Sequence, residues 1–66
     1  MKATVGTRVV LLTGGNAGVV IEERHQPYLK RFVVQYDDGR VRYVSPSELA
    51  LESDPARAPL GPPIHE

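Results

Sequence analysis

Cysteine and tryptophan are absent from this 66-residue chain, and its aromatic residues are three tyrosines and one phenylalanine. Without cysteine there is no disulfide framework and no thiolate metal site, a composition compatible with a reducing compartment. The sequence also lacks an apolar run long enough for a signal peptide or a membrane span. We therefore expect a soluble, cytoplasmic protein that makes no contact with a membrane.

A net charge is missing as well, since eight basic residues balance eight acidic ones. Nucleic-acid-binding proteins usually carry a basic excess, because neutralising phosphates supplies much of their affinity. The balance disfavours a dedicated nucleic-acid protein and leaves room for a local basic patch. A chain of this length forms one domain at most and buries a modest core.

Helical periodicity is missing from the first 52 residues, where β-branched and apolar runs are separated by turn residues. These runs, which are typical of strands, occupy residues 7–13, 17–25, 29–36 and 40–45. Asp38-Gly39 between two alternating runs is a strong hairpin signal. Pro46 cannot donate to a sheet and ends the fourth strand. The segment that follows predicts one 3-10 turn and then a short fifth strand over residues 50–52.

Five strands this short cannot stack as two sheets, but they can bend into a small barrel. We therefore predict an all-β, five-stranded barrel over residues 4–52, with the 3-10 turn before the last strand. Residues 53–66 contain four prolines. Proline lacks an amide proton and fixes φ, so this segment neither continues a sheet nor forms a helix. We predict a flexible, disordered proline-rich tail there.

The order of these elements resembles the SH3-like small barrels, including Tudor and KOW-type modules. The resemblance covers about residues 4–52 and is carried by four segments, which are VGTRVVLL at 5–12, AGVVIE at 17–22, VVQYDDGR at 33–40 and VSPSEL at 44–49. It implies a small barrel that works by binding.

A more distant resemblance in layout leads to the plasmid-encoded type II dihydrofolate reductases, SH3-like barrels that work as tetramers. Those enzymes place Val-Gln-Ile-Tyr immediately before the proline that follows the fourth strand, whereas residues 42–45 here read Arg-Tyr-Val-Ser. A shared fold does not carry an activity without its site, and no catalytic constellation is visible elsewhere. We therefore predict a non-enzymatic protein without cofactor or metal, and a reductase-like oligomer is a remote alternative.

Apolar residues stand at consecutive positions in the first two strands, at 9–12 and 19–21. Alternate residues of a strand point to opposite faces, so one set can line the barrel while the other faces outward. We predict that Val10, Leu12, Val19 and Ile21 form an exposed stripe. Such a stripe usually contacts another chain. The predicted function is protein–protein contact or self-association, with a homo-oligomer favoured.

The alternative function is Tudor- or KOW-like binding of nucleic acid or transcription machinery. Its candidate face consists of cations and rings around the third hairpin, namely Tyr28, Lys30, Tyr36, Arg40, Arg42 and Tyr43. Cations beside stacking rings suit single-stranded nucleic acid. The same cations can instead pair with nearby carboxylates on a solvated face, and Tyr36 can instead be a core aromatic. A methyl-ammonium cage would need a further ring at the end of the first strand, where none exists.

Overall fold

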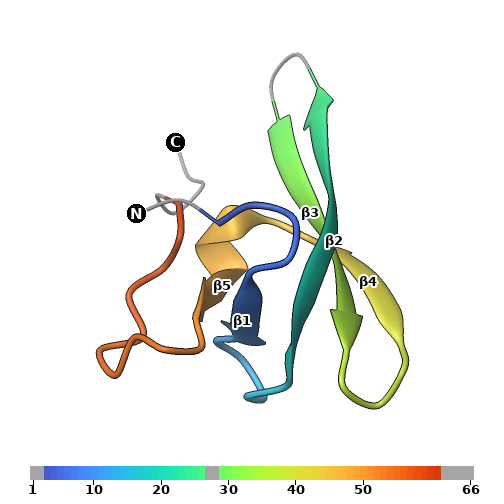
Figure 1. Cartoon of the computed structure of the whole chain (residues 1–66). Helices are drawn as coiled ribbons and strands as arrows, with labels where there is room; N and C mark the ends of the chain where they lie inside the picture. Colours follow the sequence, from blue (N-terminus) through green and yellow to red (C-terminus); the bar gives the residue numbers. More distant parts are fainter. Residues whose placement is uncertain (1–2, 27–28, 62–66) are drawn as a thin grey trace.

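The computed structural model describes residues 3–26 and 29–61 (Figure 1). Its elements are β1 (Arg8–Leu11), β2 (Ala17–Gln26), β3 (Leu29–Tyr36), β4 (Val41–Val44), the 3-10 turn η1 (Pro46–Glu48) and β5 (Leu49–Leu51). The predicted all-β class, the five strands and the 3-10 turn before the last strand are therefore confirmed.

The strands form one antiparallel sheet in the order β4-β3-β2-β1-β5. The first strand pairs with both the second and the last, so the first and last strands lie side by side at one end of the sheet. Figure 1 shows the β2–β3 hairpin extending well beyond β1 and β5. The end strands β4 and β5 are joined by η1, and no backbone pairing links them in the described residues.

Two features of β2 bend the sheet. The register with β3 shifts between Val20 and Glu22, which leaves Ile21 as the extra residue of a β-bulge, and bulges increase strand twist. At Gly18, a Cβ atom would touch the carbonyl oxygen of Gln35 and lie 2.8 Å from the Cα atom of Tyr36. Only glycine allows β2 and β3 to approach this closely.

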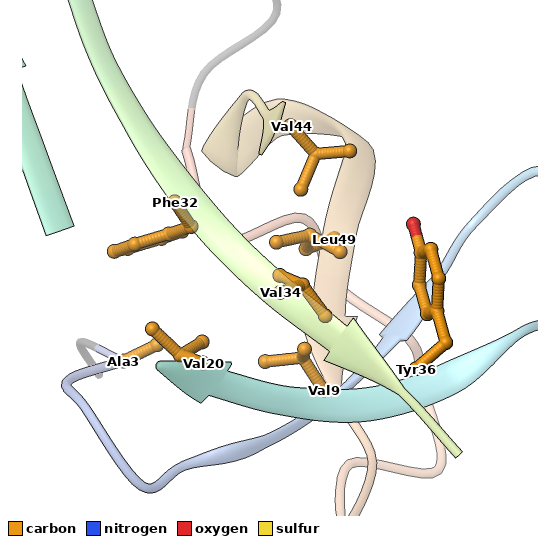
Figure 2. Packing of buried hydrophobic residues seen from close by; sticks show 8 residues of the cluster. All are labelled: Ala3, Val9, Val20, Phe32, Val34, Tyr36, Val44 and Leu49. Atoms are coloured by element: carbon orange, nitrogen blue, oxygen red, sulfur yellow. The ribbon is translucent and has the colours of Figure 1, made fainter. Parts of the chain in front are cut away.

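The hydrophobic core lies on one face of the sheet and receives side chains from all five strands (Figure 2). Its members are Ala3, Val9, Val20, Phe32, Val34, Tyr36, Val44 and Leu49. Phe32 and Leu49 are the largest of the fully buried side chains. Because each strand contributes at least one of these residues, no strand can be removed without opening the core.

Residues 53–61 turn back onto the sheet, which differs from the predicted disordered tail. Pro59 forms a backbone bridge with β5, and the N–H of Leu60 donates a hydrogen bond of 2.9 Å to the carbonyl of Leu49. The side chain of Leu60 packs against the core. The prolines restrict φ, but they do not prevent Leu60 from packing against the sheet. The predicted tail also includes residues 62–66, which lie outside the described part of the chain.

Candidate binding surfaces

The predicted contact residues of the first two strands do not form one exposed stripe. Val10 is only 7% exposed, because it lies between β2 and β5 in the sheet, so the prediction that it faces solvent is wrong. Val19 is half-buried. Leu12 and Ile21 are 39% and 41% exposed. These three residues stay predicted contacts.

A group of apolar side chains instead lies on the outer face of β2, β3 and β4, around the exposed Gln35. Val41 pairs with Gln35, which pairs in turn with Val19, and Tyr43 pairs with Val33. Residues paired across antiparallel strands share a face, and this face is opposite to the one that carries the core. Val41 is 49% and Tyr43 is 54% exposed, whereas Val33 is buried beneath them. We call Val19, Val33, Val41 and Tyr43 the outer patch.

Sequence reasoning assigned Tyr43 to a ligand face and missed Val41. The signal was present in the alternation of VRYV at residues 41–44, which places one apolar residue and one ring on the same side of the strand. The guanidinium of Arg24 lies 5.0 Å from the centre of the Tyr43 ring. A cation–π contact of this kind orients the ring on the surface.

The basic residues of the predicted nucleic-acid face are largely paired within the chain. Lys30 Nζ lies 3.9 Å from Glu23, and Arg40 Nε lies 2.9 Å from Asp38. The expectation that cations and nearby carboxylates pair on the surface is therefore confirmed for these two residues. Arg42 differs, because it forms no ion pair within residues 3–26 and 29–61.

The aromatic residues of that face are not brought together. Tyr36 is 6% exposed and belongs to the core, which confirms the core-aromatic interpretation. Tyr43 and Arg42 are consecutive in β4, so their side chains leave opposite faces of the strand. Tyr28 lies outside the described residues. No row of stacking rings is therefore formed along the hairpin in the described part.

A hollow of about 290 Å³ opens between the ends of β1, β3 and β4 and the turn η1. It is lined by Leu11, Asn16, Tyr36, Arg40, Arg42, Tyr43, Val44 and Glu48. Two aliphatic residues and two tyrosines supply its apolar lining, while two arginines, one glutamate and one asparagine supply its polar lining. This combination suits a small ligand that has both an apolar body and a charged group.

Tyr36 connects the core to this hollow. Figure 2 shows its ring at the edge of the core cluster, on the side away from Ala3. Burial raises the pKa of its phenol, and the charges of Arg42 and Glu48 act on the same group in opposite directions. The phenol is therefore neutral at neutral pH and can donate a hydrogen bond. Tyr36 is one of the residues that line the hollow.

A separate cluster is centred on Arg8. Its guanidinium donates to both carboxylate oxygens of Asp37, at 2.7 and 2.9 Å, and to both of Glu52, at 3.0 and 3.1 Å. These hydrogen bonds lower the pKa of each carboxyl and raise the pKa of Arg8. The cluster joins β1 to the β3–β4 turn and to the residue after β5. Because the guanidinium holds both oxygens of each carboxylate, the cluster ties these three segments to one another.

Among the residues that the structure describes, no three His, Cys, Asp or Glu side chains gather where a metal ion could bind. No helix of that part is long and apolar enough to cross a membrane. In comparisons with known proteins, no family model, no curated protein and no solved structure matches this chain. The functional argument therefore depends on the outer patch and the hollow themselves.

Proposed function

We propose that this chain is a non-enzymatic protein-binding module that associates with a second copy of itself through the outer patch and the edge of β4. The observation that carries this proposal is the exposure of Val41 and Tyr43, at 49% and 54%, on the face opposite the core. Large apolar side chains exposed together on one face of a small domain usually mark a contact with another chain.

The proposed module is an SH3-like small barrel. Support comes from the position of β1 between β2 and β5, and from the bulge and the close approach at Gly18, which curve β2. In a barrel of this class, curvature of this kind brings the two end strands toward each other. A barrel of this size has a small interior, so apolar side chains remain on its outside.

The open edge of the sheet favours a second copy as the partner. β4 pairs only with β3 in the described residues, whereas the opposite edge, at β5, is covered by the bridge to Pro59. An uncovered edge strand presents free N–H and C=O groups that an identical strand can pair with. A two-fold axis through such a pair would place Val41 and Tyr43 of one copy beside those of the other.

The charge of the chain is consistent with self-association. Its formal net charge is zero at pH 7, so two copies do not repel each other at long range. The face also carries both signs, because Arg24 pairs with Glu22 at 3.2 Å beside Tyr43. Pairing within each chain lowers the cost of bringing two such faces together.

Sedimentation equilibrium of the pure full-length chain over a concentration series tests the proposal. We expect a reversible monomer–dimer equilibrium that Val41→Asp weakens by at least about tenfold, because a buried unpaired charge costs more than 1.4 kcal/mol. Val5→Asp is the matched control, since Val5 is 59% exposed in the loop before β1 and lies outside the patch. Circular dichroism of both variants should match that of the parent.

A parent chain that stays monomeric at every concentration would contradict the proposal, as would equal effects of the two aspartate substitutions. Salt-sensitive retention of the chain on single-stranded DNA, lost in an Arg40→Glu/Arg42→Glu variant, would replace it with nucleic-acid binding. In that case, the salt dependence of binding should be smaller in the variant, because the variant contacts fewer phosphates.

A further inference from the structure

The hollow contains an arginine that the fold leaves unused. Arg8, Arg24 and Arg40 each hold a carboxylate through the guanidinium. Arg42 forms no such pair within the described chain, and its side chain lines the hollow. A guanidinium presents a planar fork of donors that matches a carboxylate in a bidentate arrangement. Arg42 therefore offers a ready site for one anionic group.

A second, neutral donor lies beside this cation. Tyr36 lines the same hollow, and Arg42 pairs with Val34 across β3 and β4, which places Arg42 and Tyr36 on the same face of the sheet. The tyrosine side chain is held in the core, so its hydroxyl is fixed in position before any ligand arrives. A fixed donor loses little conformational entropy on binding.

The rest of the lining limits what the ligand can be. Leu11 and Val44 provide an apolar surface, and Glu48 supplies a carboxylate that can accept an N–H. A volume of about 290 Å³ lies just below the roughly 300–1,000 Å³ of small-molecule sites. It suits one residue of a peptide and is too small for a strand of nucleotides.

We propose that this hollow binds the carboxyl-terminal residue of a peptide, or a small acylated amino acid with the same chemistry. Arg42 pairs with the carboxylate, the Tyr36 hydroxyl donates to the same group, and the apolar side chain of the ligand lies over Leu11 and Val44. The amide N–H of the ligand donates to Glu48. One ligand of this kind thus gives a partner to Arg42, to the Tyr36 hydroxyl and to Glu48.

The charges around the site favour a monovalent carboxylate over phosphate. Glu48 lies in the lining, and Asp38 is 2.9 Å from the neighbouring Arg40. Both carboxylates repel an anion that carries more than one charge, and this repulsion grows with the charge of the ligand. A carboxylate with an adjacent N–H places one charge at Arg42 and a donor at Glu48.

A titration followed by ¹H–¹⁵N NMR of the full chain tests this site, with N-acetyl-L-leucine as the probe. We expect saturable shifts confined to residues that line the hollow, with a dissociation constant on the order of 1 mM for so small a ligand. N-acetyl-L-leucinamide, which lacks the negative charge, should bind at least about tenfold more weakly. A tetrapeptide ending in leucine distinguishes a peptide terminus from a free small acid, because only the former gains affinity from the added residues.

Variants separate the proposed contacts. Arg42→Gln should weaken the acid at least about tenfold and leave the amide unchanged. Tyr36→Phe keeps the core ring, so a roughly threefold to tenfold loss for the acid would report the hydroxyl alone. Arg57→Gln is the control, because Arg57 is an exposed arginine outside the hollow. It should bind both probes as the parent does.

Three results would overturn the assignment. They are equal binding of acid and amide, unchanged binding of the acid by Arg42→Gln, and stronger shifts of the same residues by inorganic phosphate than by the acid. Repeating the titration in the Val41→Asp variant keeps this test separate from self-association. The hollow should bind its probe there whether or not the parent chain dimerises.

Discussion

Replacing Gly18 with alanine probes the approach of β2 and β3 that curves the sheet. An added methyl group would contact the Gln35 carbonyl oxygen and would lie 2.8 Å from the Cα of Tyr36 and 2.9 Å from the carbonyl carbon of Gln35. These are backbone atoms of a paired strand, so no side-chain rotation relieves the contact. The strands must separate, which weakens adjacent hydrogen bonds such as the 2.9 Å bond from Asp37 N–H to the Ala17 carbonyl.

The size of the effect follows from these two costs. Overpacking costs about 1–3 kcal/mol, and one weakened backbone hydrogen bond adds roughly 0.5–1.5 kcal/mol. We therefore expect Gly18→Ala to lower the free energy of unfolding by about 2–4 kcal/mol. A domain of this size is stable by only roughly 3–5 kcal/mol. The variant should unfold at a temperature lower by roughly 10–30 °C.

Urea and thermal unfolding followed by far-ultraviolet circular dichroism measure this change. Gly14→Ala is the control, because it reduces the conformational entropy of the unfolded chain as much as Gly18→Ala does. Nothing lies within 4 Å of the position that a Cβ atom would take at Gly14. Its φ of +91° makes alanine cost about 1–2 kcal/mol there. A Gly18→Ala variant as stable as Gly14→Ala would refute the argument that backbone contact dictates glycine in β2.

Three further predictions concern the core, the C-terminal segment and the Arg8 cluster. Leu49→Ala, at a position that is 0% exposed, should lower the free energy of unfolding by about 2–5 kcal/mol, and a urea-measured loss below about 1 kcal/mol would argue against its central place in the core. Leu60→Ala should cost about 1–2 kcal/mol, whereas a disordered residue would show no change. Asp37 and Glu52 have lowered pKa values in the folded chain. As the pH falls, these two carboxyl groups are therefore protonated in the unfolded chain before they are protonated in the folded chain. The two carboxylates stabilise the fold fully above their ordinary pKa values of 3.8 and 4.5. This stabilisation is lost as the pH falls through their lowered pKa values in the folded chain. In an Arg8→Met variant, the unfolding midpoint should fall less steeply with decreasing pH than it does in the parent. A plot of midpoint against pH that runs parallel to that of the parent would contradict the assignment.

The turns and the order of the elements along the chain could be predicted because they depend on local chemistry. Asp38-Gly39 closes the third hairpin with Gly39 at a φ of +96°, as its preference for positive φ indicated. Pro46 begins η1, because a residue without an N–H can occupy the first position of a helical turn. Phe32 and Tyr36 alternate into the core, as period-two patterning requires.

The burial of individual residues could not be predicted, because it depends on contacts between distant segments. Val10 resembles an outward-facing strand residue, yet it is buried at its position between β2 and β5. Leu60 lies among prolines, which suggested disorder. Its N–H nevertheless donates to the carbonyl of Leu49, and its side chain packs against the core. The hollow also escaped prediction. Its lining comes from separate segments of the chain, and Arg42 stands out only after the carboxylate partners of Arg8, Arg24 and Arg40 are known.

The most direct test of the central claim, self-association through β4, is an isotope-filtered NMR experiment on a mixture of labelled and unlabelled chains. The account predicts intermolecular contacts between the methyl groups of Val41 in one copy and the Tyr43 ring in the other, because a symmetric pair of β4 strands places them on one face. Intermolecular contacts that instead involve Val5, or an absence of any such contacts at concentrations where sedimentation detects a dimer, would contradict it.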